Sequence, residues 1–189
     1  MIPRYNCSVL DRDQILAALG RLASVLRERE TTGELCLLGG TVMVLAFRAR
    51  PATKDVDAIF QPTTVVREAA VQVGQELGLP EDWLNDGAKA FASTNHQVAT
   101  GDLPQFEALR IVAPTAEYML AMKCMASRIA HADTDPSDAA DIRFLLDRLG
   151  ITTVEAALDI VAAFYPPDRV PPRAGYLLED ILASSGDAR

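Results

Sequence analysis

Two pairs of residues in the first third of the chain have the types and spacing that phosphate chemistry requires. Gly39 and Gly40 end an apolar run, and Asp55 and Asp57 follow after a short interval. Residues two apart in a strand project to the same side, so both carboxylates would point one way while Val56 turns into the core. Neighbouring carboxylates repel each other unless a cation lies between them, and Mg²⁺ shares such oxygen ligands with substrate phosphates. The pair therefore predicts a site for Mg²⁺ or Mn²⁺.

The double glycine supplies the second half of the same prediction. A turn without side chains lets backbone N–H groups approach a phosphate closely, and a helix that follows it offers its positive end. We therefore expect Gly39, Gly40 and Thr41 to receive a triphosphate whose metal lies on the two acids. A glycine pair alone is usually a turn, and an Asp-x-Asp alone is usually a solvated strand end. Their combination, with Thr53 just before the acids, is much less common.

The elements that must position these residues change in character along the chain. Up to about residue 112, apolar periodicity predicts helices alternating with short strands; beyond it the pattern is helical only. The expected helices of the first part are 11–30, 41–48 and 63–79, and the expected strands are 34–38, 56–60 and 106–112. The expected helices of the second part are 114–131, 135–150, 153–164 and 174–184. This predicts an α+β fold, with a small mixed sheet and flanking helices in 1–112 and a helical part, 113–189, packed as one unit with that core.

The composition argues against several classes of protein. The 18 basic residues against 26 acidic ones give a net charge of −8, which argues against non-specific coating of nucleic acid. Three widely spaced cysteines and two histidines argue against a disulfide framework or a zinc site. No apolar run is long enough to cross a membrane, and the first residues do not form a secretory signal, so we expect a cytoplasmic protein without membrane partners.

The stretch from Gly39 to Asp57 resembles the core motif of the nucleotidyltransferase superfamily. Gly-Gly-Thr followed by Arg-x-x-Thr-x-Asp-x-Asp, which contains Arg50 and Thr53, is most similar to AbiEii-type toxins of type IV toxin–antitoxin systems and related uncharacterised bacterial nucleotidyltransferases. The segment Trp83 to Asp86 also resembles one found in some of those relatives. The resemblance is strong over 35–60 and moderate over 115–147. It implies a nucleotidyltransferase-type core in which Arg50 and Thr53 help to bind the nucleotide.

The same resemblance extends to the helical part. AbiEii-like proteins carry a lysine on one helix and an aspartate on the next, and Lys123 and Asp141 are the matching residues here. Asp141 borders the apolar face of its expected helix, where a carboxylate requires a cationic partner. Lys123 is therefore expected to pair with Asp141. The pair would either only join the two helices, or its lysine would also bind the triphosphate. Arg128 is expected to assist in nucleotide binding.

One feature departs from the superfamily pattern. Members often carry a third carboxylate on a later strand, and Glu107 is the best candidate for that metal ligand here. A solvent-facing glutamate is an equally good interpretation of the same residue. If the third acid is missing, the metal site would be weaker or built differently.

The resemblance implies a magnesium-dependent enzyme that moves a nucleotide from an NTP to a hydroxyl acceptor and releases pyrophosphate. The acceptor would be RNA, such as a tRNA end, and the enzyme would act as a toxin restrained by an antitoxin protein; a small-molecule acceptor is the other possibility. The alternative is a nucleotidyltransferase-like fold kept as a binding or regulatory module with little turnover, and a missing third acid would favour it.

Overall fold

The computed structural model describes residues 9–126 and 136–186. These residues form two compact units, one made of 9–90 and 98–113 and the other of 91–97, 114–126 and 136–186. The mixture of helices with a mixed sheet confirms the α+β class expected from the sequence. The first unit ends at residue 113, and residues 91–97 belong to the second unit. The expectation that both parts pack as one unit stays a prediction.

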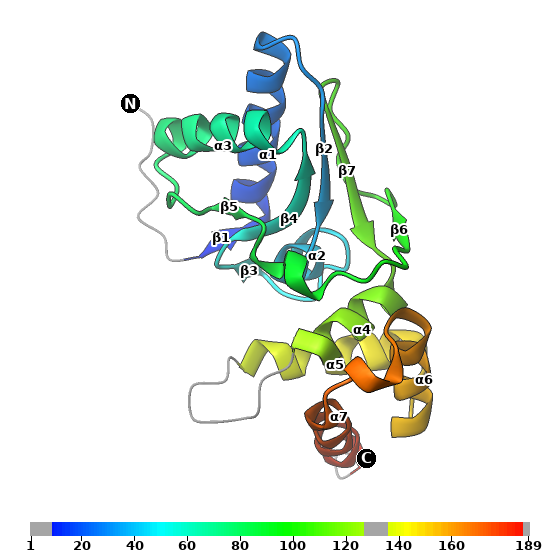
Figure 1. Cartoon of the computed structure of the whole chain (residues 1–189). Helices are drawn as coiled ribbons and strands as arrows, with labels where there is room; N and C mark the ends of the chain where they lie inside the picture. The colour runs from blue at the N-terminus through cyan, green and yellow to red at the C-terminus, as the bar shows by residue number, and fades with distance from the viewer. Residues whose placement is uncertain (1–8, 127–135, 187–189) are drawn as a thin grey trace. The chain divides into compact units, whose positions relative to one another are not determined.

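The first unit contains a five-stranded sheet with the order β5-β4-β2-β7-β6 and a separate two-stranded pair, β1 and β3 (Figure 1). Its elements are β1 (Leu10–Asp11), α1 (Arg12–Glu28), β2 (Gly33–Leu37), α2 (Gly39–Leu45), β3 (Ala52–Thr53), β4 (Val56–Gln61), α3 (Thr63–Leu77), β5 (Leu84–Asn85), the 3₁₀ helix η1 (Gly87–Phe91), β6 (Val98–Ala99) and β7 (Leu109–Pro114). The last residues of η1 and β7, Phe91 and Pro114, belong to the second unit. Strand β2 is antiparallel to β4 and parallel to β7, and β4 is parallel to β5.

Helices α1 and α3 cover one face of this sheet (Figure 1). A Cβ atom added to Gly33, at the start of β2, would lie 2.9 Å from Leu26 of α1 and 3.3 Å from Val66 of α3, so both helices meet the sheet there. The residues of β2 and β4 that face these helices are fully or almost fully buried: Leu35, Leu37, Val56, Ala58 and Phe60. Alternation in β4 therefore leaves Asp57 and Ile59, both half-buried, on the other face.

The second unit is built from helices that pack around buried aromatic residues. Its elements are α4 (Ala116–Ala126), α5 (Pro136–Leu149), α6 (Val154–Phe164), the 3₁₀ helix η2 (Pro167–Arg169) and α7 (Pro172–Gly186). Tyr118 of α4 stacks on Phe164 at the end of α6, with ring centroids 4.9 Å apart. The hydroxyl oxygen of Tyr118 also accepts a hydrogen bond from the backbone N–H of Ser93, which ties 91–97 to this unit.

Most predicted elements lie within a few residues of the observed ones. The main difference is the third strand, which begins at Leu109 instead of Phe106. The backbones of Phe106 and Leu109 bond to each other in both directions, so 106–109 form a tight turn that delays the strand. The two-residue strands β1, β3, β5 and β6 were not predicted.

Candidate functional site

The centre of the site is a close approach between Gly39 and Asp57. Gly39 has a positive φ of 56°, a conformation in which a residue with a side chain is strained. A Cβ atom added to it would lie 2.6 Å from Oδ2 of Asp57, so the carboxylate fills the space that a side chain would take. Both residues are half-buried, which leaves the turn and the acid accessible from solvent.

The residues before the acids pack against the rest of the glycine turn. A Cβ atom on Gly40 would lie 2.3 Å from Oγ1 of Thr53 and 3.1 Å from Nη2 of Arg50. The hydroxyl of Thr41 donates a 3.0 Å hydrogen bond to the backbone carbonyl of Asp55. The chain from Arg50 to Asp57 therefore runs along the turn, and the spacing of the sequence motif corresponds to these successive contacts.

These contacts involve two threonines with expected roles in nucleotide binding. Thr41 is fully buried with its hydroxyl committed to Asp55, and Thr53 is 8% exposed with its side chain against Gly40. Their side chains contact the acid-bearing segment and the turn, and the expected role of Thr41 and Thr53 in nucleotide binding stays a prediction. Helix α2, the helix that follows the turn, is short: it has seven residues and begins at Gly39 itself. The accessible parts of the turn are Gly39 and Gly40.

Asp55 and Asp57 lie on either side of the fully buried Val56, as the alternation predicts. Strand β5 runs beside them, with Asn85 in register with Asp57. The Asn85 amide donates a 2.9 Å hydrogen bond to Oδ2 of Asp55. Oδ1 of Asp57 lies 3.9 Å from the position of a Cβ on Gly87. The Asp57 carboxylate is thus bordered by two glycines, Gly39 and Gly87, neither of which places a side chain over it.

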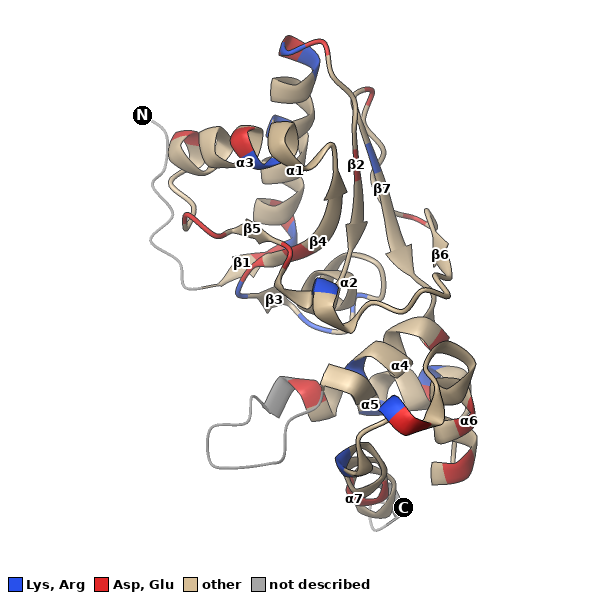
Figure 2. Ribbon diagram, viewed as in Figure 1, with Lys and Arg blue, Asp and Glu red and all other residues tan. Residues whose placement is uncertain are grey.

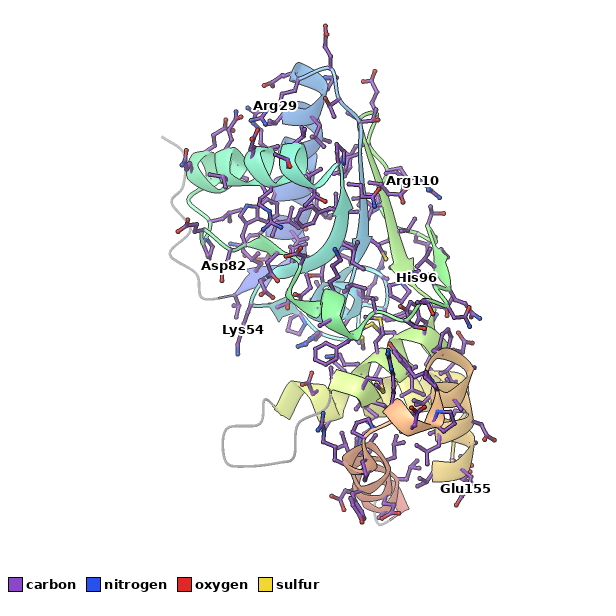
Figure 3. All side chains as sticks on the ribbon, in the orientation of Figure 1. Arg29, Lys54, Asp82, His96, Arg110 and Glu155 are labelled. Atoms are coloured by element: carbon purple, nitrogen blue, oxygen red, sulfur yellow. The ribbon has the colours of Figure 1, made fainter. Side chains whose placement is uncertain are left out.

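Glu107 does not join these acids, which corrects its expected role as a third metal ligand. It lies two residues before Leu109, which pairs with Gly33 at the start of β2, whereas Gly39 follows the end of β2. The strand between these points spans roughly 16 Å at the usual rise per residue. The Glu107 side chain is 81% exposed and lies 3.6 Å from Arg27. Figure 3 shows Arg29 near that end of the first unit and Lys54 and Asp82 near the other.

Among the described residues, no third acid joins Asp55 and Asp57 in place of Glu107. Within the parts of the chain that the structure describes, no group of three or more His, Cys, Asp or Glu side chains is arranged to hold a metal. Strand β7, the neighbour of β2, ends in Val112, Ala113 and Pro114 and brings no acid to the glycine turn. Acidic residues do gather at the start of β4 and around β5 (Figure 2).

In the second unit, the expected pairing of Lys123 with Asp141 is confirmed. Nζ of Lys123 lies 2.8 Å from Oδ2 of Asp141 and 2.6 Å from Oδ1 of Asp138, one helical turn earlier on α5. Lys123 is 8% exposed and Asp141 is 4% exposed. Asp138 was not predicted, although its position three residues before Asp141 places it on the same side of the helix. Arg128, the remaining candidate for nucleotide binding, lies outside the described residues.

The segment that contains Trp83 is anchored within the first unit. The indole N–H of Trp83 donates a 2.9 Å hydrogen bond to the carbonyl of Ala70, and the residue is fully buried. The indole is therefore part of the core and is not placed to stack on a nucleotide base. Its backbone carbonyl accepts a bond from Val56, which fixes β5 beside the acids.

Comparison of the chain with models of protein families, with curated proteins and with solved structures gave no match. Among the described residues, no helix is both long enough and apolar enough to cross a membrane. The geometry of the site indicates its chemistry. That geometry joins a side-chain-free turn to two oxygen-donating acids in a half-buried position, which suits an ion that shares its ligands with a phosphate.

Proposed function

We propose that the first unit is a nucleotidyltransferase that binds a nucleoside triphosphate with Mg²⁺ or Mn²⁺ and transfers its nucleotide to a hydroxyl acceptor. The observation that carries the proposal is the position of the Asp57 carboxylate, 2.6 Å from where a Gly39 side chain would begin. A phosphate at the turn and an ion at the carboxylate would then be direct neighbours. This arrangement supports phosphoryl-type transfer because that reaction depends chiefly on positioning and on neutralising charge.

The residues present fit a magnesium ion. Mg²⁺ in phosphoryl-transfer sites is commonly held by one or two carboxylates together with substrate phosphates, so the pair of Asp55 and Asp57 is sufficient in number. A Cβ atom on Gly39 would lie 2.6 Å from Oδ2 of Asp57, so a larger residue at position 39 would take the space beside that carboxylate. When bound, the ion would polarise the phosphoryl oxygens and neutralise charge on the leaving group.

The chain's own residues would orient the reactants. Gly39 and Gly40 admit the triphosphate, and the guanidinium of Arg50, beside Gly40, adds positive charge to that turn. The acceptor oxygen forms a bond to the α-phosphorus as the bond from that phosphorus to pyrophosphate breaks. The hydroxyl proton passes to a carboxylate of the pair or to solvent, and pyrophosphate leaves with the bonding electrons.

The acceptor and the cellular role are proposed from the resemblance over 35–60 and 115–147. On that basis the acceptor is RNA, such as a tRNA end, and the enzyme is a cytoplasmic toxin restrained by an antitoxin protein. Incubation with labelled NTPs and total cellular RNA tests the acceptor. Labelling of a defined RNA species supports it, and the absence of label from every RNA species would contradict it.

Isothermal titration with NTP, with and without Mg²⁺, tests the binding site itself. We expect magnesium-dependent binding that weakens more than about tenfold in Asp57→Asn, because a metal ligand is lost. Glu107→Gln is the matched control, since it also removes one carboxylate but lies at the other end of β2; it should bind like the wild type. Binding that is indifferent to Mg²⁺ and to Asp57→Asn would contradict the proposal.

A second candidate, a binding or regulatory module with little turnover, is favoured by one observation. The described residues include no group of three potential metal-ligating side chains. Pyrophosphate release separates the two functions. Magnesium-dependent NTP binding with pyrophosphate release in the presence of RNA indicates the enzyme, and the same binding without release from any acceptor indicates the module.

A further inference from the structure

Asn85, on β5, contacts the acid pair through its side-chain amide. Its Nδ2 donates to Oδ2 of Asp55 at 2.9 Å and to the backbone carbonyl of Asp82 at 3.3 Å. Its Oδ1 accepts from the backbone N–H of Gly87 at 2.9 Å. The amide nitrogen donates twice while the amide oxygen accepts once, so these bonds fix which end of the amide faces Asp55.

The residues around Asn85 hold it in that position. The preceding Trp83 is bonded to α3, and Leu84 is buried in register with Val56. The following Asp86 lies 3.3 Å from a guanidinium nitrogen of Arg67, which also belongs to α3. Each member of the Trp-Leu-Asn-Asp segment thus has a contact with α3 or β4, and Asn85 is the one directed at the acids.

We propose that Asn85 is a positioning residue that fixes the plane of the Asp55 carboxylate for metal binding. This inference rests on the proposed function, because it concerns the metal that the acid pair would hold. A hydrogen bond to one oxygen restrains rotation of the carboxylate, and partners that orient metal ligands in this way contribute strongly to metal affinity. Asn85 acts through Asp55 and needs no contact with the nucleotide.

A double-mutant cycle with Asp55 tests this role. In Asn85→Ser the hydroxyl can still accept from the N–H of Gly87, which preserves the turn, but it is too short to reach Asp55. We expect this variant to raise the Mg²⁺ concentration for half-maximal NTP binding about tenfold. In an Asp55→Ala background the same change should raise it less than about twofold, since the carboxylate that Asn85 orients is absent.

Each outcome of the cycle decides one question. An equal effect of Asn85→Ser in both backgrounds, or no effect in the wild type, overturns the role of Asn85 while leaving the proposed function intact. A wild-type protein whose NTP binding ignores Mg²⁺ overturns the proposed function, and the role of Asn85 with it. Thermal unfolding of each variant shows whether the fold is kept.

Asn85→Thr provides a second variant if the serine variant does not fold, because a β-branched side chain suits a strand position. Its hydroxyl keeps an acceptor for the N–H of Gly87 but is too short to reach Asp55. The expected result is again a loss of magnesium affinity that is larger in the wild-type than in the Asp55→Ala background. Equal losses in both backgrounds, or no loss in the wild-type background, would overturn the proposal.

Discussion

The carboxylate of Asp57 occupies the space beside Gly39 that any larger residue at position 39 would need. The added Cβ would lie 2.6 Å from Oδ2, closer than such atoms approach in proteins. The glycine thus serves two purposes, since it permits the positive φ of the turn and makes room for the acid. Substitution at position 39 should therefore affect both the backbone and the position of Asp57.

Gly39→Ala should abolish most magnesium-dependent NTP binding. The strained backbone should cost about 1–2 kcal/mol of unfolding free energy, and displacement of Asp57 should weaken binding more than about tenfold. Gly101→Ala is the matched control, because Gly101 also has a positive φ, of 47°, but no atom lies within 4 Å of its added Cβ. It should lose similar stability and retain binding. Equal binding by both variants would show that the contact with Asp57 is unimportant.

Thr41→Val should show whether the hydroxyl of Thr41, and not the packing of its side chain, positions Asp55. Valine keeps the shape of the buried side chain but removes the hydrogen bond to the carbonyl of Asp55, which should cost about 1 kcal/mol. We expect a several-fold loss of magnesium-dependent NTP affinity, measured by titration calorimetry, with recovery in Thr41→Ser. Failure of serine to restore affinity would indicate that the methyl group, and not the hydroxyl, positions the acid.

Lys123→Met should destabilise the second unit by about 3 kcal/mol, because it leaves the Asp141 carboxylate, 4% exposed, without its ammonium partner. The double variant Lys123→Met with Asp141→Leu should recover to within about 1 kcal/mol of the wild type, since a buried ion pair can be replaced by apolar groups. Urea unfolding gives both values. Lys89→Met, at an exposed lysine, is the control and should change stability by less than about 0.5 kcal/mol.

The same double variant distinguishes the two interpretations of Lys123. If the pair only stabilises the fold, the double variant, whose stability is restored, should bind NTP with magnesium as the wild type does. If the ammonium also meets the triphosphate, binding should fall although the fold is restored.

Cys36 should react with iodoacetamide slowly at neutral pH and faster as the pH rises. Burial, and then the charge of Glu34, raise the pKa of this thiol from 9.0 to about 11. The thiolate is the reactive form, so the labelling rate should increase about tenfold per pH unit up to about pH 10. The raised pKa also means that the thiol's contribution to stability is complete below pH 9 and is lost as the pH rises through 11.

Mass spectrometry of timed labelling reactions measures these rates. Cys124 is the internal comparison, because it is fully buried and burial raises its pKa to about 12. It should be labelled more slowly than Cys36 at every pH at which the fold persists. A Cys36 rate that stops rising near pH 9 would contradict the raised pKa.

Local patterns in the sequence were sufficient to predict the long elements and the meeting of the glycine turn with Asp57. The apolar periodicity of α1 and the apolar character of β2 and β4 are local properties, and the pairing of β2 with β4 then brings the turn to the acids. The partner of Lys123 was also predictable, because Asp141 borders an apolar helix face.

The contribution of Asn85 could not be predicted in this way. It lies thirty residues after Asp55, on a two-residue strand whose position depends on Trp83 and on packing against α3. Glu107 was misplaced for a similar reason, since the turn closed by Phe106 and Leu109 moves the start of β7 past it. Both cases depend on backbone pairing between distant segments, for which a short stretch of sequence carries little signal.

The buried indole beside β5 gives the molecule an optical probe of its own. The chain has one tryptophan, and Trp83 is enclosed by the core of the first unit. Its fluorescence emission reports the loosening of that unit, whereas far-ultraviolet circular dichroism sums the helices of both. Recording the two signals during one denaturant titration would therefore resolve whether the two units melt together or in sequence, without any label being attached.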